Sequence, residues 1–208
     1  MNMTKRIAKN AVSLLSIILI SPVIILYRSL NAFLGSDSLF AAFSQLLGLI
    51  PGKTGNYLRA SFYRFTMKSC SRDTVISFLV LFAQQDTEIS SGVYIGPNCN
   101  IGSCKIGRNT LFGSGVHIIS GKKQHNFDDP DKYIKDQQGS LEKISIGEDC
   151  WIGNGAIILA SIGDKCIVGA GSVVVSSIPP YSIVAGNPCR IVGSRKKQTP
   201  DPESPLVQ

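Results

Sequence analysis

The two histidines of the chain, His117 and His125, are its clearest candidates for proton transfer. His125 lies in a polar segment, residues 119–143, whereas His117 lies in an apolar stretch just before it. A neutral imidazole can accept a proton near neutral pH, so a histidine in a polar loop could activate a hydroxyl group. A polar insertion of this length inside a regular pattern usually has a function. The question is therefore which structure positions the loop.

A short repeat flanks this loop on both sides. An aliphatic or aromatic residue followed by glycine recurs mostly at a six-residue step, and the pairs begin at Ile95, Ile101, Ile106, Phe112, Ile146, Ile152, Ile162 and Val168. A period of six fits neither an α-helix nor a lone strand. It fits a solenoid in which three short strands per coil wind around a triangular prism. The glycine fits a turn whose backbone needs a conformational freedom that a Cβ atom would deny.

The position two residues before each repeating aliphatic residue tests this interpretation. It holds only small or β-branched side chains, namely Cys99, Cys104, Thr110, Val116, Cys150, Ala156, Ala160, Cys166 and Ser172. Four of the six cysteines share this register, which predicts packing residues of a tight inner column. The sequence has no C-x-x-C pair of the kind used by structural zinc sites. We therefore expect free thiols in a reducing compartment.

The repeat region, about residues 87–193, resembles the hexapeptide-repeat acyltransferase superfamily. The resemblance to galactoside, maltose and polysaccharide O-acetyltransferases is strongest at residues 151–153, 162–164, 168–174, 178–180 and 184–190. It implies an all-β fold class, a left-handed parallel β-helix, over residues 74–193 with a catalytic loop at 119–143. It also implies a homotrimer that uses acetyl-CoA as acyl donor and no metal. Residues 1–73 would form an N-terminal α-helical membrane-associated segment, and residues 194–208 a flexible tail.

The resemblance also implies roles for loop residues. In this family a histidine on a long loop is the general base, and the context of His125, QHNFD, resembles that site. We expect His125 to take the hydroxyl proton as the oxygen attacks the thioester, with backbone N–H groups stabilising the oxyanion. Asn126, Asp128 and His117 are the expected acceptor-binding residues. His117 could instead be a structural residue of the last coil, and Asp128, like its acidic neighbours in the loop, could be merely solvated.

Coenzyme A lies, in this family, in a groove between neighbouring prisms beside the C-terminal coils. By resemblance, Asn154, Ala170 and Gly171 would contact the pantetheine arm, and Trp151 would shape the groove. The turn at Pro180 would meet the adenine and phosphates.

Basic side chains suit the phosphates of the cofactor. The candidates are Arg190 together with Arg195, Lys196 or Lys197. Many relatives carry Thr-Lys where this chain has Val175-Ser176, so one lysine contact is lost or supplied elsewhere.

All of the surplus positive charge lies in the first third of the chain. Residues 1–73 hold nine Lys/Arg and two Asp, whereas residues 74–208 hold twelve basic and twelve acidic side chains. A neutral C-terminal body argues against a nucleic-acid groove, which needs clustered cations. Basic residues beside apolar runs indicate an anionic lipid surface instead.

Residues 11–27 are apolar apart from three serines and Pro22. As a helix they would extend about 25 Å, slightly short of a hydrocarbon core of roughly 30 Å. A second apolar run, residues 39–50, reads as another helix, and basic residues flank the pair on both sides. We expect residues 11–50 to anchor the chain as an interfacial or re-entrant hairpin on the cytoplasmic face of the bacterial inner membrane. Two true spans and a soluble helical cap are the alternatives, and a signal peptide is disfavoured because no small-residue cleavage site follows.

The expected activity is O-acetyl transfer to a saccharide hydroxyl in cell-surface polysaccharide or lipid-linked glycan biosynthesis, since a soluble acceptor needs no anchor. Serine and the amine of an amino-sugar nucleotide are alternative acceptors, although such enzymes usually carry a longer helical region or an added nucleotide-binding domain. A non-catalytic trimeric scaffold is a further alternative. Zinc carbonic anhydrases that share this prism need three histidine ligands per site, and this chain has two histidines.

Overall fold

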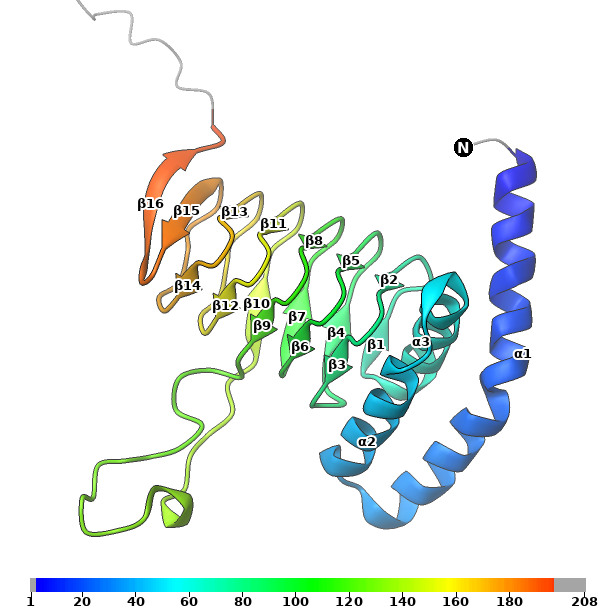
Figure 1. Ribbon diagram of the computed structural model, residues 1–208, viewed down its shortest axis with the longest axis horizontal. Coiled ribbons are helices and arrows are strands. Elements are labelled where there is room, and N and C mark those ends of the chain that lie inside the picture. The colour runs from blue at the N-terminus through cyan, green and yellow to red at the C-terminus, as the bar shows by residue number, and fades with distance from the viewer. Residues whose placement is uncertain (1–2, 197–208) are drawn as a thin grey trace, which may run out of the picture.

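A computed structural model describes the chain from residue 3 to residue 196, with side chains from residue 9 onward. Three helices form a cap at one end of a parallel β-helix (Figure 1): α1 (Met3–Leu34), α2 (Asp37–Gly48) and α3 (Gly52–Thr66). Helix α2 begins at a favourable capping residue, because the Ser36 side chain accepts a hydrogen bond from the Leu39 N–H. Residues 197–208 of the expected tail, Lys197 among them, lie outside the described residues, and residue 194 belongs to the last strand.

Short strands in three sheets build the β-helix. Sheet A contains β1 (Ser69–Cys70), β4 (Glu88–Ile89), β7 (Cys104–Ile106) and β10 (Ile144–Ile146). Sheet B contains β2 (Val75–Ile76), β5 (Tyr94–Ile95), β8 (Leu111–Phe112), β11 (Trp151–Ile152), β13 (Ile167–Val168), β15 (Ser182–Gly186) and β16 (Cys189–Ser194). Sheet C contains β3 (Leu81–Phe82), β6 (Asn100–Ile101), β9 (His117–Ile118), β12 (Ile157–Ile158) and β14 (Val173–Val174).

Successive strands fall on sheets A, B and C in turn, and all pairings except β15 with β16 are parallel. Isolated bridges from Ile146 to Ile162 and from Ile162 to Ile178 continue sheet A. The six parallel strands of sheet B therefore mark six coils, and the predicted parallel β-helix is confirmed. A 3-10 helix, η1 (Ile134–Asp136), lies in the loop between β9 and β10.

The β-helix begins at Ser69, ahead of the boundary expected at Thr74 and of the repeat recognised from residue 87. The inward side chains of these first strands, Ile76 and Phe82 among them, are buried in the same way as those of later coils. Ser77 and Ala83 stand where later coils carry glycine. The first strands therefore lack the aliphatic-glycine pattern, although they have the same β-helix coil geometry as the later ones.

The repeating glycines are required for a different reason from the one expected. A Cβ on Gly113 would lie 2.7 Å from the backbone nitrogen of Asn154 in the next coil, and one on Gly153 would lie 2.5 Å from that of Ala170. Neither glycine has a positive φ. The constraint is thus the close approach of successive coils, and left-handed backbone occurs at other turn positions, such as Gly155 and Asn109.

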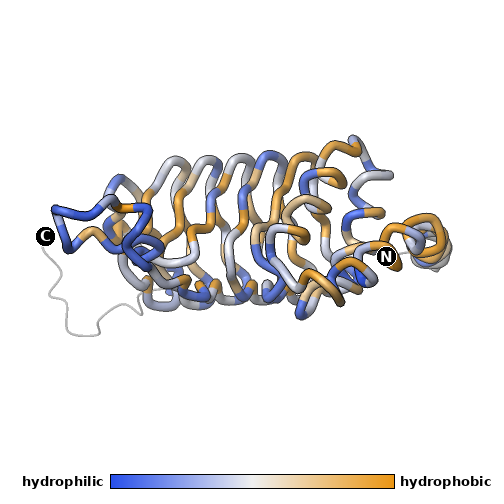
Figure 2. Tube along the Cα trace, turned by 90° about the horizontal axis from the view of Figure 1, so that it is seen from below, coloured by the Kyte–Doolittle hydropathy of each residue, from blue (hydrophilic) through white to orange (hydrophobic). Residues whose placement is uncertain are grey.

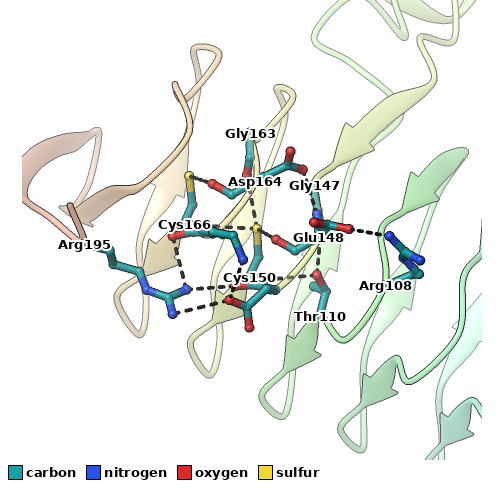
Figure 3. Close-up of polar contacts among 11 residues, drawn as sticks. Arg108, Thr110, Gly147, Glu148, Cys150, Gly163, Asp164, Cys166 and Arg195 are labelled. Carbon is teal, nitrogen blue, oxygen red and sulfur yellow. Dashed lines mark hydrogen bonds and ion pairs between the residues drawn. The ribbon is translucent and has the colours of Figure 1, made fainter.

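The column of small residues is buried, as predicted, and its members are 8% exposed or less. The polar members of the column are hydrogen-bonded: the Cys150 thiol donates to the Gly163 carbonyl at 3.1 Å (Figure 3), and the Cys166 thiol donates to the Pro179 carbonyl at 3.1 Å. Thr110 at the same position donates to the Gly147 carbonyl at 2.8 Å. The column therefore links each coil to the turn of the next.

The helical cap replaces the coil that would precede the first one. The Phe82 N–H donates to the Ser44 hydroxyl at 2.8 Å, and the Leu79 N–H to the Gly48 carbonyl at 3.0 Å. Arg59, which is fully buried, donates from Nε to the Ile76 carbonyl at 3.0 Å and from Nη1 to the Leu47 carbonyl of α2 at 2.9 Å. The backbone groups at this edge of the β-helix are thus paired with the cap.

One helix among the described residues, α1, is long and apolar enough to span a membrane, over Lys9–Leu34. Figure 2 shows hydrophobic colouring over most of this helix. Length and composition alone support this statement, since core helices and signal sequences pass the same test. The second apolar run forms α2, which has twelve residues and contacts β3 of the first coil, and its Phe40 and Leu47 are buried. The alternative with two spans is therefore not supported.

We predict that only Cys189 of the six thiols reacts readily in the native protein. The other five are buried, and burial raises the pKa of Cys99 and Cys150 to about 11, which suppresses the reactive thiolate. Alkylation with N-ethylmaleimide, followed by peptide mass mapping, should label Cys189 at least about 100-fold faster than the rest, as a local opening free energy of about 3 kcal/mol would give. Equal labelling of Cys150 and Cys189 before unfolding would contradict the inner column.

Candidate active site

The loop that carries His125 leaves the β-helix through a narrow neck. The Ser120 hydroxyl, which is buried, accepts a hydrogen bond from the Ser103 N–H at 2.8 Å, and the Ser120 carbonyl accepts one from the Glu142 N–H at 2.9 Å. One step further out, the Ser140 N–H donates to the Lys123 carbonyl at 2.6 Å. The two arms therefore run together to the point where the loop widens, and Figure 1 shows the wider part projecting away from the prism.

Four charged residues anchor the returning arm of the loop to the second coil. Lys143 Nζ lies 2.9 Å from Glu88 Oε1, and Lys68 Nζ lies 2.9 Å from the same oxygen. Lys143 also lies 3.5 Å from Asp86 Oδ2, and the Ser103 hydroxyl donates to the Asp86 carboxylate at 2.8 Å. Hydrogen bonds from Lys143 and Lys68 lower the pKa of the Glu88 carboxyl to about 2. Glu88 is therefore ionised at every physiological pH and holds the neck in place.

The outer part of the loop is folded by its own residues. Asp129 Oδ2 pairs with Lys132 at 2.8 Å, and the Asp129 carbonyl accepts a hydrogen bond from Gln137 Nε2 at 2.9 Å. The Asp131 N–H donates to Asp129 Oδ1 at 3.1 Å. Asp129 thus shapes the tip of the loop, whereas Asp128 is exposed.

His125 lies on the outgoing arm with an exposed side chain, as does Asn126. The backbone of His125 lies against Gly139 of the returning arm, and a Cβ on Gly139 would come within 2.6 Å of the His125 backbone nitrogen. Gly139 is therefore a positioning residue that the sequence interpretation missed, because nothing in the pattern pairs it with His125. His117 lies on β9, between Asn100 and Ile157 in sheet C, and its side chain is exposed on the outer face rather than stacked inside the prism.

The structure brings three of the expected cofactor-binding residues together at the corner between sheets B and C. The Gly171 N–H donates to the Asn154 carbonyl at 2.8 Å, and Ala170 lies beside it in the same turn. Asn154 Oδ1 accepts a hydrogen bond from the Ser114 N–H at 3.0 Å, which fixes its side chain. A Cβ on Gly171 would meet nothing within 4 Å, so this corner is open to a ligand.

The other expected cofactor residues are more dispersed. Trp151 lies on the outer face of sheet B, 57% exposed, whereas Pro180 lies at the corner between sheets A and B. Arg190 is exposed on β16 and donates from Nη1 to the carbonyl of its neighbour Cys189 at 3.0 Å.

The basic residues after Arg190 are partly engaged within the chain. Figure 3 shows Arg195 reaching back along the prism, where Nη1 donates to the Asp149 carbonyl at 2.9 Å and Nη2 lies 3.4 Å from the Asp149 carboxylate. Lys196 Nζ lies 5.0 Å from the centre of the Tyr181 ring. Arg195 therefore ties β16 to the preceding coils, which leaves Arg190 as the more accessible guanidinium for a phosphate.

An exposed apolar ladder runs along the outer face of sheet B. Tyr94, Leu111 and Trp151 stand in register on adjacent strands and are 39%, 48% and 57% exposed. Each precedes an inward residue of the repeat, so the period itself could have revealed the ladder. Exposed apolar side chains that line up in this way commonly mark an interaction surface.

Taken together, the loop offers an imidazole and the open corner offers backbone and amide groups to an extended ligand. Within residues 3–196, no group of three or more His, Cys, Asp or Glu side chains gathers as a metal site would require. This arrangement suits acid–base chemistry on a ligand held along the prism.

Family models match both sides of the loop. Residues 86–120 match the bacterial transferase hexapeptide model of six repeats, and residues 143–176 match the model of the hexapeptide repeat of succinyl-transferase. A search of curated proteins finds no match.

Solved structures share the fold. A hexapeptide-repeat acetyltransferase from Vibrio cholerae is 20% identical with a TM-score of 0.65, over 77% of this chain and 93% of that one. A maltose O-acetyltransferase from Clostridium difficile is 22% identical with a TM-score of 0.58, over 76% and 86%. An N-acyltransferase from Bacillus cereus, in complex with dTDP-4-amino-4,6-dideoxyglucose and coenzyme A, is 18% identical with a TM-score of 0.53, over 62% and 74%. The chain thus contains hexapeptide repeats on both sides of the loop and shares its fold with these transferases.

We predict that the anchor of the loop depends on the charge of Glu88. Its carboxyl pKa is lowered from 4.5 to about 2, so its contribution to stability is complete above pH 4.5 and is lost as the pH falls through about 2. A ¹³C NMR titration of the Glu88 carboxyl should give a midpoint well below 4.5. Lys143→Gln should raise this midpoint, and Lys68→Gln should raise it less. A midpoint that is the same in all three proteins would show that the ion pairs do not form.

Proposed function

We propose that the protein is an acetyl-CoA-dependent acyltransferase that transfers an acetyl group to a saccharide hydroxyl. The observation that carries this proposal is the position of His125, on a loop that interrupts a hexapeptide β-helix at the corner between sheets C and A. Structural relatives that are acetyltransferases, and one that binds coenzyme A, support the same reaction.

The chemistry needs one general base and a site for the developing negative charge. The imidazole of His125 accepts the proton of the acceptor hydroxyl while the oxygen attacks the thioester carbonyl of acetyl-CoA. The tetrahedral intermediate then collapses, the carbon–sulfur bond breaks, and the imidazolium returns the proton to the departing thiolate of coenzyme A. Backbone N–H groups at a turn are suited to stabilise the oxyanion.

Coenzyme A would lie along the corner between sheets B and C. The absence of a side chain at Gly171 lets an extended pantetheine arm approach the backbone, and Asn154 and Ala170 line the same edge. Arg190, exposed near the end of the prism, would meet the phosphates.

We infer that the active site is completed by a second copy of the chain in a homotrimer. The loop projects away from its own prism, so His125 faces bound coenzyme A only if another prism lies beside the loop (Figure 1). The apolar ladder of sheet B is a suitable contact surface, because burying Leu111 and Trp151 removes exposed apolar area from water.

The two faces of α1 support a membrane role. Ile20, Ile24 and Tyr27 are buried against the rest of the cap, whereas Ile18 and Ile25 are 60% and 64% exposed on the opposite face. A helix packed along its length on a polar body suits the plane of the interface better than a span. An enzyme held there is suited to a lipid-linked glycan acceptor, and the basic flanks favour the cytoplasmic face of the bacterial inner membrane.

The amine of an amino-sugar nucleotide is the second candidate acceptor. It is supported by the Bacillus cereus N-acyltransferase, whose complex holds an amino-sugar nucleotide. The general-base step is the same, since an ammonium or amine must also lose a proton before or during the attack.

We predict that His125→Ala lowers the rate of acetyl transfer by about 10² to 10⁴-fold, the usual cost of losing a general base. Thiol release from acetyl-CoA by the detergent-purified protein measures this rate, with membrane glycolipid extract, an amino-sugar nucleotide or serine as acceptor. His117→Ala is the control and should change KM for the acceptor by less than about tenfold, as one lost hydrogen bond would. Full activity of both variants would show that another residue is the general base. Acetylation of serine alone would show that the acceptor is serine and not a saccharide.

We predict that Leu111→Arg dissociates the trimer, because a charge in the middle of an apolar contact surface must be desolvated without a partner. Light scattering coupled to size-exclusion chromatography gives the mass of the particle. Lys105→Ala, on the outer face of sheet A, is the matched control and should leave the mass unchanged. A trimer that survives Leu111→Arg would place the interface on another face.

A further inference from the structure

A cavity of about 310 Å³ lies where α1, α3 and the first coil meet. Its volume is at the lower end of the range for small-molecule sites. Four of its lining residues are cations, one from α1, two from α3 and one from the first coil: Lys9, Lys53, Arg64 and Arg72. The loop of His125 and the open corner of sheets B and C belong to later coils, so the acyl-transfer site leaves this cavity unexplained.

The charge around the cavity is strongly unbalanced. Asp73 is the one carboxylate in the lining, and its Oδ1 accepts a hydrogen bond from the Ser71 hydroxyl at 2.7 Å. Arg72 Nη2 donates to Asn10 Oδ1 at 2.9 Å, which joins α1 to the first coil and leaves other guanidinium N–H groups for a ligand. The cavity therefore presents several donors to an anion.

The buried positive charge of Arg59, behind the wall of the cavity, makes the electrostatic potential inside the cavity more positive. The guanidinium of Arg59 bonds only to neutral acceptors in the structure, namely the carbonyls of Leu47, Ile50 and Ile76 and the side chain of Asn56. Its Nη2 donates to Asn56 Oδ1 at 2.9 Å, and Asn56 lines the cavity. The bond turns the amide nitrogen of Asn56 away from Arg59, so this nitrogen is free to donate to a ligand.

The cavity also lies at a depth, relative to the exposed apolar face of α1, that would place it among lipid phosphates if that face were buried in a membrane. The lining residues of α1, such as Ser13 and Ile17, belong to the side that faces α3, whereas Leu15 and Ile18 are exposed on the other side. A helix with its side chains is about 10 Å across. An interfacial helix buries its apolar face roughly 5–10 Å into the boundary of headgroups and acyl chains, so the cavity would lie among the lipid phosphates.

We propose that this cavity binds the phosphate headgroup of an anionic phospholipid and thereby fixes the orientation of the protein on the membrane. The cations and Asn56 contact the phosphate, while Ile17 and Tyr57 provide an apolar wall for the glycerol and the first acyl carbons. The inference rests on the membrane association proposed above, but not on the acetyl-transfer chemistry.

The test compares binding to two kinds of vesicle, phosphatidylcholine alone and phosphatidylcholine mixed with phosphatidylglycerol. Wild type should bind the anionic vesicles more tightly in a sedimentation assay. The double variant Lys53→Gln/Arg64→Gln should lose about 25-fold in affinity for them, as two cations at an anionic surface contribute roughly fivefold each. Its binding to phosphatidylcholine, and its thiol release from acetyl-CoA with a soluble acceptor, should stay unchanged.

The matched control is Lys105→Gln/Lys122→Gln, which removes the same charge from exposed sites outside the cavity. It should weaken binding by less than about threefold, since charges beyond a Debye length of about 10 Å are screened. An equal loss in both double variants would reduce the effect to net charge and overturn the proposal. So would wild-type binding that is equal on both kinds of vesicle, although membrane association would then stand.

Two further results separate the proposal from its premises. If wild type binds neither vesicle yet still transfers acetyl groups, the membrane role and the headgroup site fail together while the enzyme assignment survives. If inorganic phosphate alone raises the Tm of wild type but not of Lys53→Gln/Arg64→Gln, the cavity is a site for soluble phosphate and the lipid assignment is wrong.

Discussion

The close stacking of one coil on the next is the constraint on which the rest of this structure depends. Successive coils are joined by backbone hydrogen bonds such as that from the Gly113 N–H to the Ile152 carbonyl at 2.8 Å, and a Cβ on Gly113 would destroy this spacing. Every inward position is then committed to packing. Functional groups can occur only on the outer faces, at corners, or where a coil is interrupted. His125 occupies an interruption, and Gly171 occupies a corner.

The sequence predicts the periodic part of this structure well, because each coil repeats the same physical requirement. Small residues such as Cys150 and Cys166 could be placed in the interior without coordinates, since a side chain in that column has no room to be large. The first coils escaped recognition because Ser77 and Ala83 stand where later coils carry glycine. The aliphatic-glycine pair therefore does not mark these coils, although their inward residues Ile76 and Phe82 are buried in the same way.

Contacts between distant segments could not be predicted in the same way. The neck of the loop depends on Glu88, which lies 55 residues before its partner Lys143, and no period relates them. Arg195 shows the same limit of charge patterns: its charge suggested a phosphate ligand, and the fold also places it beside Asp149 within the chain. Charge alone identifies a side chain that needs a partner, and the fold decides which partner is within reach.

The pairing of the first coil with the helical cap has a consequence for assembly. A prism built from identical coils could in principle extend by placing the last coil of one molecule on the first coil of the next, which would produce an open filament. Such growth needs free backbone groups at both ends of the prism. Because Ser44, Gly48 and Arg59 already bond to the first coil, one end is blocked in every molecule. Open end-to-end growth is then prevented, and association through the sides of the prism leads instead to closed rings of limited size.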